Sequence, residues 1–423
     1  MSSRIPGFRH LDVGERRRAV AEQAGTDLAT LDGLGADAFG TEQAAAMIEN
    51  AIGVFPVPVG VATNVVVDGR EVLVPMATEE ASVVAAASNG ARMTRALGGF
   101  TTSATAPVMQ VQIQLVDVPD PRAARLRLLE HADELVALAD EQDPRLVQVG
   151  GGVRGLQVRL VDGAHQTYVV LHLAVDVRDA MGANAVNTMA EALAGRVAQI
   201  GGGRVVLRIL TNLADQRLVR ARAVLRAEDV GGEQVVEDML HGYELARVDP
   251  YRAATHNKGI MNGISAVVLA TGNDTRAVEA GAHAYAAVAH PPYGSLSTYE
   301  RDGDGHLVAT LEVPMPVGLV GGATRVHPSA RAALSVLGVS SAAELGAIIT
   351  AVGLAQNIAA VRALAADGIQ RGHMSLHAKN IAASAGATGD EVAAVVDRLV
   401  AEGAFRQDRA EEILADLRAG STG

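Results

Sequence analysis

The stretch VMQVQIQLVDVPDPRAARLRLLEHADELVALADE, residues 108–141, joins a strand pattern to a helix pattern and decides the fold of the middle of the chain. Its first part, 108–118, alternates apolar and polar residues, which predicts a β-strand. Its second part, 120–141, has helical periodicity and begins with proline and acidic residues, as helix starts do. The sequence therefore predicts a strand followed directly by a long helix.

The segments that follow complete a recognisable order. GLQVRLV (155–161) and TYVVLHLAVDV (167–177) predict two more strands, joined by the turn-rich DGAHQ. A helix is expected from about 181 to 199, and GGRVVLRIL (202–210) predicts a last strand. The resulting order is β-α-β-β-α-β, the ferredoxin-like or split-βαβ pattern. We expect one compact domain here, over 108–218.

The rest of the chain is richer in helical patterns and shows no second unit of this kind. We therefore predict an α+β protein in which a large helix-rich domain, residues 1–107 and 219–375, is interrupted by the ferredoxin-like domain. Within the large domain, GREVLVPMA (69–77) predicts a strand. The segment 376–423 predicts a separate helical unit, because GDEVAAVVDRLVAEGAF has helical periodicity between a capped start and a glycine stop.

Composition excludes several classes of protein. Of 423 residues, 49% are hydrophobic and 20% are charged, which indicates a folded protein of more than one domain. The net charge of −12 argues against a nucleic-acid partner. The absence of cysteine excludes disulfides and thiolate metal sites. Neither an apolar signal core near the N-terminus nor a membrane-spanning apolar run is present, so we expect a cytoplasmic protein.

Lysine is rare enough to draw attention to its positions. Only Lys258 and Lys379 are lysines among the 36 basic residues. Lys258 lies in HNKGIMNG, just ahead of the apolar run ISAVVLA. An ammonium can release a proton at a pH where a guanidinium cannot. The position predicts proton chemistry at Lys258, although a chance survivor of compositional bias is an equally simple explanation.

Other candidates have ordinary structural explanations when each is taken alone. The loop DAMGAN (179–184) joins a predicted strand to a predicted helix, and could bind a diphosphate at the helix N-terminus or be a turn capped by Asp179. Glu79 and Glu80 after Thr78, and Asp274 in GNDTR, fit helix starts. His373 and His377 share a helical face, but no third metal ligand is evident and we predict no metal site.

Together, these segments resemble a known family. ENAIGVFPVPVGVATN, VPMATEEASVVAAAS, VDVRDAMGANAVNTMAEA, THNKGIMNGISAVVLATGNDTRAVEAGAHAYA and GHMSLHAKNIA are similar to the class II, soluble bacterial type of 3-hydroxy-3-methylglutaryl-coenzyme A (HMG-CoA) reductase. The resemblance extends in order over essentially the whole chain. It implies two hydride transfers that convert HMG-CoA to mevalonate and free coenzyme A, or the reverse oxidation.

The resemblance also implies roles for individual residues. The family's catalytic groups fall on Glu80, Lys258, Asp274 and His373. Lys258 would stabilise the oxyanion or supply a proton, and Glu80 would act as an acid whose pKa Asp274 raises and Lys258 lowers. His373 would protonate the coenzyme A thiolate from a mobile C-terminal flap.

For ligands, the resemblance implies that Ser82, Arg252 and Asn262 bind the hydroxymethylglutaryl group. It places the nicotinamide cofactor in the ferredoxin-like domain, beside a set of residues from three loops: Asp143, Asp179, Met181, Gly182, Asn184 and Asn212. A carboxylate at Asp143 would accept hydrogen bonds from a ribose 2′-hydroxyl and repel a 2′-phosphate, so we expect NAD(H) rather than NADP(H). Arg145 nearby could compensate.

The family further implies a homodimer or larger oligomer with active sites between subunits. Two alternatives stay open at this stage. The same fold could serve an NAD-dependent oxidoreductase of another acyl-CoA, or the middle domain could belong to a non-catalytic ligand-binding protein. Alanine also stands at 81, where the family motif usually has proline after the catalytic Glu80.

Overall fold

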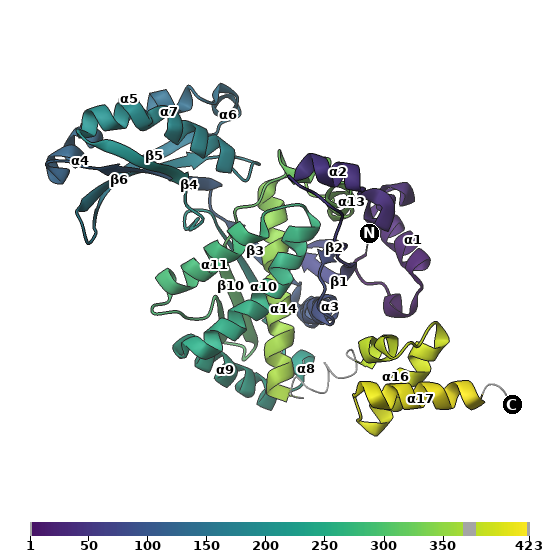
Figure 1. Cartoon of the computed structure of the whole chain (residues 1–423). Coiled ribbons are helices and arrows are strands. Elements are labelled where there is room, and N and C mark those ends of the chain that lie inside the picture. The colour runs from purple at the N-terminus through teal and green to yellow at the C-terminus, as the bar shows by residue number, and fades with distance from the viewer. Residues whose placement is uncertain (1, 367–377, 421–423) are drawn as a thin grey trace.

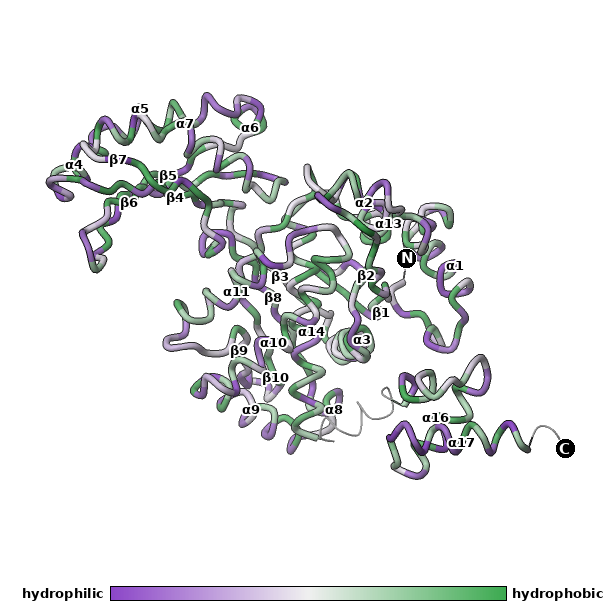
Figure 2. Tube along the Cα trace, in the orientation of Figure 1, coloured by the Kyte–Doolittle hydropathy of each residue, from purple (hydrophilic) through white to green (hydrophobic). Residues whose placement is uncertain are grey.

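The computed structural model describes residues 2–366 and 378–420. Two β-sheets organise the chain from the N-terminus to the end of α14, each with its own hydrophobic core. The four-stranded sheet and its helices form the smaller lobe of Figure 1, and the six-stranded sheet lies in the larger lobe. Hydrophobic residues follow the strands of the small sheet in Figure 2.

The small sheet has the ferredoxin-like arrangement that the sequence predicts. Its strand order is β5-β6-β4-β7, and every neighbouring pair is antiparallel. The helices lie together on one face of the sheet (Figure 1). The elements in chain order are β4 (Val108–Val116), α4 (Pro121–Glu130), α5 (Ala132–Asp140), α6 (Pro144–Gln148), β5 (Gly152–Asp162), β6 (Thr167–Asp176), α7 (Ala183–Gly201) and β7 (Arg204–Leu210).

The long helix expected over 120–141 is instead broken into two. α4 ends and α5 begins at His131, whose backbone has left the helical region with φ −100° and ψ 18°. The His131 ring nitrogen Nδ1 lies 2.8 Å from the carbonyl oxygen of Arg127, within hydrogen-bond reach at the break. Helical periodicity continues through the break, because both helices bury leucines against the same sheet face (Leu128 and Leu135). Periodicity alone therefore could not reveal it.

The four-stranded sheet is inserted in the sequence between two neighbouring strands of the six-stranded sheet. Its order is β2-β1-β3-β8-β10-β9, and β3 pairs with β8 although the whole small domain lies between them in sequence. The chain thus leaves the large sheet after β3 and returns to it beside the same strand. The strands are β1 (Val59–Val67), β2 (Arg70–Ala77), β3 (Phe100–Ala104), β8 (Leu218–Leu225), β9 (Ser297–Arg301) and β10 (Leu307–Pro314).

Helices cover this sheet and carry much of the core. They include α3 (Val83–Thr94), α8 (Ala227–Val230), α9 (Glu233–Val248), α10 (Pro250–Ala270), α11 (Thr275–Ala289), α12 (Ala323–Val326), α13 (Pro328–Leu337) and α14 (Ala342–Ala366). α14 runs through the middle of the large lobe (Figure 1) and packs against α3, α9 and α10. It is long and apolar enough to cross a membrane, but 72% of its most apolar window is buried inside the fold. It is a core helix.

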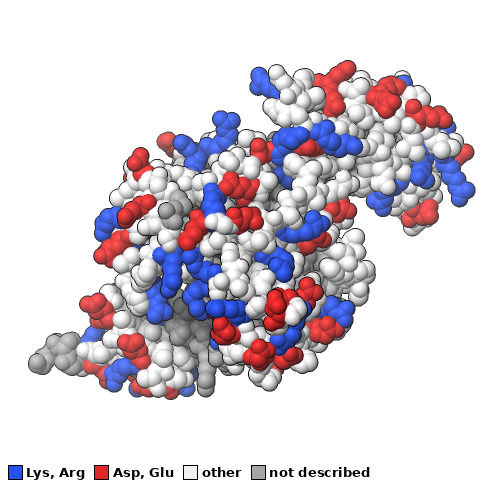
Figure 3. Space-filling model, turned by 180° about the vertical axis from the view of Figure 1, so that it is seen from behind, with Lys and Arg blue, Asp and Glu red and all other residues white. Residues whose placement is uncertain are grey.

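The two ends of the chain add smaller units. The N-terminal segment contains η1 (Phe8–His10), α1 (Val13–Ala24), η2 (Leu28–Leu34), η3 (Ala36–Ala38) and α2 (Thr41–Met47), and η4 (Arg95–Leu97) follows α3. The C-terminal unit contains a helix at 378–384, α16 (Asp390–Glu402) and α17 (Gln407–Gly420), around a core of its own. The predicted glycine stop is confirmed at Gly403, which has φ 63°. Acidic and basic side chains are both spread over the face shown in Figure 3.

Candidate active site

The side chains of Glu80 and Lys258 meet in an ion pair. The ammonium Nζ of Lys258 donates to Oε2 of Glu80 at 2.9 Å, across 178 positions of sequence. Both side chains keep solvent access, with exposed fractions of 60% for Lys258 and 38% for Glu80. An ion pair with this much solvent access contributes little to the stability of the fold. A role in chemistry is therefore the better explanation for it.

Glu80 lies in a loop, not in the first turn of a helix. β2 ends at Ala77 and α3 begins only at Val83, so Thr78 is not the helix cap that its position suggests. Thr78 Oγ1 instead accepts a hydrogen bond from the Glu80 N–H at 3.2 Å. Ser82 is the N-cap of α3 with φ 83°, and its side chain makes no capping bond. A non-glycine residue held in this region costs about 1–3 kcal/mol, which is typical of functional loops.

Lys258 lies on one face of α10, together with Asn262, Ser265 and Leu269. Their spacing of four, three and four residues places these side chains in one row along the helix. The face beside them is buried, since His256 and Asn257 are 2% and 0% exposed. The row therefore forms the accessible edge of an otherwise embedded helix.

Polar contacts fix α10 next to Lys258. The Asn257 side chain donates to Gly294 O at 2.9 Å and accepts from Leu296 N at 3.0 Å. His256 Nε2 lies 2.7 Å from the Ser297 hydroxyl oxygen. Burial, and then the charge of Arg252, lowers the pKa of His256 to about 3, so this imidazole is neutral at physiological pH. The network sets the rotation of α10 and with it the direction of Lys258.

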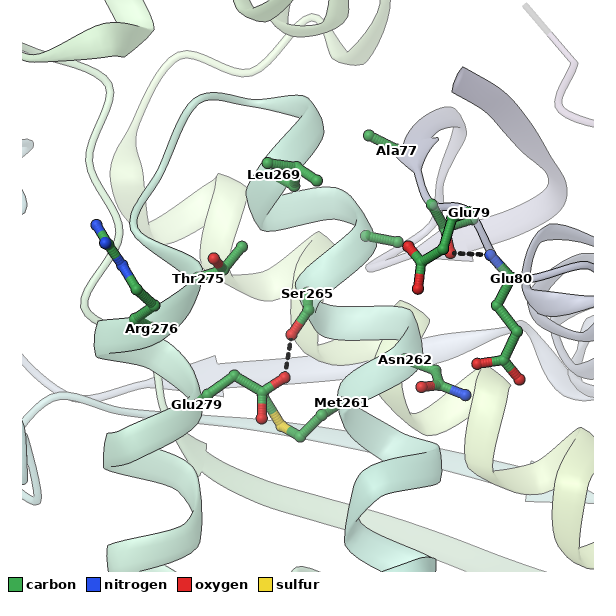
Figure 4. Close-up of a pocket in the computed structure, with 12 residues that line it drawn as sticks. Ala77, Glu79, Glu80, Met261, Asn262, Ser265, Leu269, Thr275, Arg276 and Glu279 are labelled. Carbon is green, nitrogen blue, oxygen red and sulfur yellow. Dashed lines mark hydrogen bonds between the residues drawn. The ribbon is translucent and has the colours of Figure 1, made fainter. Parts of the chain in front are cut away.

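A cavity of 510 Å³ lies between the Glu80 loop, α10 and α11. Figure 4 shows Met261 and Asn262 with Glu80 on one side and Glu279 on the other. The residues that line it are Ala77, Thr78, Glu79, Glu80, Met261, Asn262, Ser265, Ala266, Leu269, Thr275, Arg276 and Glu279. Its volume suits a small acyl group, and its walls carry both carboxylates and hydrogen-bonding side chains.

Asp274 and Arg252 lie at the edges of this arrangement. Asp274 is the N-cap of α11, as its sequence context suggests; its Oδ1 accepts from Arg276 N at 3.0 Å and Ala277 N at 3.1 Å. Arg252 is in the first turn of α10, ten residues and about 15 Å along the axis before Asn262. Partial burial lowers the pKa of the Arg252 guanidinium. Of the predicted catalytic and substrate-binding residues that the structure describes, Glu80 and Asn262 line the cavity, whereas Ser82, Arg252, Lys258 and Asp274 do not.

The DAMGAN loop joins β6 to α7, as the sequence predicts. Gly182 is the N-cap of α7 with φ 103°, a conformation that glycine adopts readily. It supplies no side chain to accept from the first N–H groups of the helix. Asn184 is exposed beside these groups and Met181 is half-buried. The N-terminus of α7 is thus chemically suited to an anion such as a diphosphate.

Asp179 caps a different helix from the one expected. Its Oδ1 accepts from Ala342 N, the first residue of α14, at 2.7 Å. Buried Arg217 reinforces the same junction by donating to the carbonyl oxygens of Ala180, Met181 and Val317. Burial lowers the pKa of Arg217 to about 10, and nearby Asp176 and Asp179 oppose that shift. Asp179 therefore helps to fasten the DAMGAN loop to the large domain.

Asp143 and Asn212 belong to two further loops of the small domain. Asp143 is the N-cap of α6, with Oδ1 accepting from Leu146 N at 3.0 Å. The turn after α6 reaches the DAMGAN side, because Gly150 O accepts a hydrogen bond from Arg178. Asn212 follows β7 and is exposed, and its carbonyl lies against Gly281 of α11.

His373 and His377 lie outside the described residues. Among the described residues, one group has metal-ligand geometry: Asp302, Asp304 and His306, whose ligand atoms lie within 4.8 Å of one another. They form the turn between β9 and β10, where Asp302 Oδ1 accepts from the backbone N–H of both other residues. Turn formation accounts for this group.

Two cavity residues escape the sequence analysis. Ser265 Oγ donates to Glu279 Oε1 at 2.5 Å, across the cavity wall between α10 and α11. The signal for Ser265 was available, because it lies seven residues after Lys258 and thus on the same helical face. Glu279 could be found only once α10 and α11 were packed together.

Comparison with known proteins identifies the family of the chain. The family model described as hydroxymethylglutaryl-coenzyme A reductase matches residues 12–378. The 3-hydroxy-3-methylglutaryl-coenzyme A reductase of Archaeoglobus fulgidus is 53% identical over 418 residues, covering 99% of this chain and 95% of its own length.

Solved structures give the same result. A reductase of that name from Streptococcus pneumoniae is 38% identical with a TM-score of 0.83, covering 97% of this chain and 99% of its own. A class II structure from the same organism, bound to NADPH in open conformations, has a TM-score of 0.82 at 38% identity and covers 85% and 99%. The chain belongs to the hydroxymethylglutaryl-coenzyme A reductase family.

Proposed function

We propose that the Glu80–Lys258 pair is the chemical centre at which this reductase converts the thioester of HMG-CoA to the primary alcohol of mevalonate, releasing coenzyme A. The observation that carries this proposal is the 2.9 Å contact of Lys258 Nζ with Glu80, a residue that lines a cavity sized for an acyl group. The reaction consumes two hydrides and two protons, and runs in reverse when mevalonate, coenzyme A and oxidised nicotinamide cofactor are in excess.

The role proposed for each residue follows from its charge and from whether it can donate a proton. The ammonium of Lys258 faces the carbonyl oxygen, which becomes negative when hydride adds to carbon. Glu80 in its acid form donates a proton to the aldehyde oxygen in the second step. Asp274 and His373 are assigned by motif, His373 as the acid that protonates the coenzyme A sulfur. Ser82, Arg252 and Asn262 bind the hydroxymethylglutaryl group. The guanidinium of Arg252 pairs with the free carboxylate of that group.

The small domain offers a fitting site for the nicotinamide cofactor, which would supply hydride. The uncapped N-terminus of α7 presents N–H groups and positive dipole to a diphosphate. We assign Asp179, Met181 and Asn184 of this loop, Asn212 after β7 and Asp143 at the start of α6 to the same cofactor site.

We expect NADH to be preferred over NADPH, because Asp143 would repel a 2′-phosphate. In Asp143→Asn the side chain still caps α6 but loses its charge. The ratio of kcat/KM for NADPH to that for NADH should rise about tenfold, which corresponds to about 1.4 kcal/mol. Steady-state oxidation of each cofactor with HMG-CoA measures this ratio. A relative of known structure is bound to NADPH. If the wild-type enzyme prefers NADPH, Asp143 does not select the cofactor, and the proposed reaction is unaffected.

We also propose that the protein is cytoplasmic and forms a homodimer with active sites between the two subunits. The segment between α2 and β1 exposes Ile52 and Phe55 at 102% and 89%, while Val57 packs beside the cavity wall at Ala77. A second copy would bury these side chains. Sedimentation velocity should give twice the chain mass for wild type and the monomer mass for Phe55→Asp. A wild-type monomer would contradict the proposal.

A further inference from the structure

One segment of the large domain, residues 315–320, contacts both the DAMGAN loop and the loop that precedes α11. It follows β10, and its backbone is buried from Met315 to Gly318. Val320 at its end forms a parallel bridge with Ala180 of the DAMGAN loop. We call residues 315–320 the connecting segment.

The connecting segment lies directly against the backbone of the DAMGAN loop. The Leu319 N–H donates to the carbonyl oxygen of Asp179 at 2.9 Å. At Gly318 the two backbones are so close that a Cβ would lie 2.4 Å from Met181 N and 2.8 Å from the carbonyl carbon of Ala180. Glycine is therefore needed at 318 because a backbone, not a movable side chain, occupies the space beside it.

Arg217 binds the same two elements at once. Its Nη1 donates to the carbonyl oxygens of Ala180 and Met181 at 3.1 and 3.0 Å, and its Nη2 donates to that of Val317 at 2.5 Å. The Arg217 backbone oxygen accepts from Met315 N at 2.9 Å. Only 4% of Arg217 is exposed, so breaking these hydrogen bonds would leave buried polar groups unpaired, which is costly. The connecting segment therefore fixes the place of the DAMGAN loop on the large domain.

Asn273 joins this support to the loop of Asp274. Its Oδ1 accepts from the Gly318 N–H at 2.8 Å, and its Nδ2 donates to Thr271 Oγ1 at 3.2 Å. The Thr271 hydroxyl donates in turn to Val267 O, near the end of α10, at 2.9 Å. Asp274 is the next residue and caps α11. One hydrogen bond and one backbone contact thus separate the residue before Asp274 from Met181.

The turn between α10 and α11 closes without the side-chain oxygen of Asn273. Gly272 N donates to Leu269 O at 3.0 Å, and Asn273 N donates to Val268 O at 2.9 Å. The carboxylate of Asp274 then accepts from the first N–H groups of α11. The Asn273 Oδ1 is therefore not needed for the turn, and its hydrogen bond to the connecting segment needs another explanation.

We propose that Asn273 is a positioning residue, which holds Asp274 at a fixed place relative to the DAMGAN loop through its hydrogen bond to Gly318. This inference rests on the proposed roles of Asp274 in the chemistry and of the DAMGAN loop in binding the nicotinamide cofactor. Hydride transfer needs closely aligned reactants, so a shift of about 1 Å between the two loops lowers turnover without removing any group that binds a ligand.

Asn273→Ala tests this role, because it removes the hydrogen bond and keeps every residue proposed to contact a ligand. We expect kcat for HMG-CoA reduction to fall about tenfold, while KM for HMG-CoA and Kd for NADH change by less than about twofold. Binding should persist, since Asn273 is not among the described residues that line the cavity and the DAMGAN loop keeps its bonds to Leu319 and Arg217. Fluorescence titration with NADH measures cofactor binding independently of turnover.

Asp68→Ala is the matched control for a loss of stability. Asp68 Oδ1 accepts from Thr102 N at 2.8 Å, the same length as the bond from Gly318 to Asn273. It lies in the turn between β1 and β2, at the opposite end of β2 from Glu80. Its loss should lower the thermal unfolding midpoint at least as much as Asn273→Ala does, and leave kcat unchanged. Equal losses of kcat in the two variants would mean that Asn273 acts through fold stability alone, and the positioning role would be wrong.

Gly318→Ala disturbs the same contact from the connecting segment. Because the new Cβ must push away the backbone of Met181 and Ala180, Kd for NADH should rise about tenfold and kcat should fall. In the double variant with Asn273→Ala, the loss of kcat should be smaller than the product of the two single losses, because both changes break one contact. Losses that multiply would show that the two residues act independently, and would overturn the proposal.

The failure of this inference can be told apart from that of the proposed function. A folded Asn273→Ala enzyme with wild-type kcat would reject the positioning role and keep the reductase mechanism. A wild-type enzyme that leaves HMG-CoA unreduced would refute the proposed function, and this inference with it.

Discussion

Lys258→Ala should lower kcat for HMG-CoA reduction by about a thousandfold while leaving the fold intact. Removing a single group that stabilises a developing oxyanion typically costs 10²–10³-fold, and loss of a proton donor adds to this. Stability should hardly change, because the Lys258 side chain is 60% exposed and its ion pair with Glu80 is solvated. Steady-state cofactor oxidation and thermal unfolding of the two proteins measure both quantities.

Lys258→Arg separates the two roles of the amine. A guanidinium keeps the positive charge near Glu80 but is a very poor proton donor at neutral pH. We expect this variant to retain HMG-CoA binding and to recover little of the lost turnover. Turnover of Lys258→Ala within a few fold of wild type would exclude Lys258 from the chemistry altogether.

Gly90→Ala should destabilise the large domain by about 3 kcal/mol, the upper part of the range for overpacked cores. A Cβ at Gly90 would lie 1.9 Å from the carbonyl oxygen of Ala355 and 2.6 Å from its carbonyl carbon. Because these are backbone atoms of α14, no side-chain rotation can relieve the clash, and α3 must move away from α14. The unfolding midpoint should fall by about 5 °C.

A matched glycine provides the control for this prediction. Gly242 lies inside α9, and a Cβ there would meet no atom within 4 Å. Gly242→Ala should therefore raise stability by about 0.5–1 kcal/mol, the usual gain for glycine to alanine in a helix. Differential scanning calorimetry of both variants gives the comparison. Equal midpoints for Gly90→Ala and wild type would mean that α3 and α14 are not packed this closely.

The sequence by itself predicted the order of strands and helices around the four-stranded sheet, and its family resemblance named the two residues that meet in the ion pair. Strand alternation and helical period predicted β-α-β-β-α-β, and the observed order β5-β6-β4-β7 confirms it. The family resemblance also named Glu80 and Lys258, which the structure joins at 2.9 Å. These features are legible because each follows from a local period or from a long ordered motif.

Only the tertiary structure decided which groups share the cavity. The capping of α14 by Asp179 joins residues 163 positions apart in sequence. Glu279 enters the site because α11 packs beside α10, which brings Ser265 within 2.5 Å of it. A helical pattern fixes which face of α11 is buried, but not which neighbour covers it. For that reason Asp274 stood out in the sequence, and Glu279 emerged only in the fold.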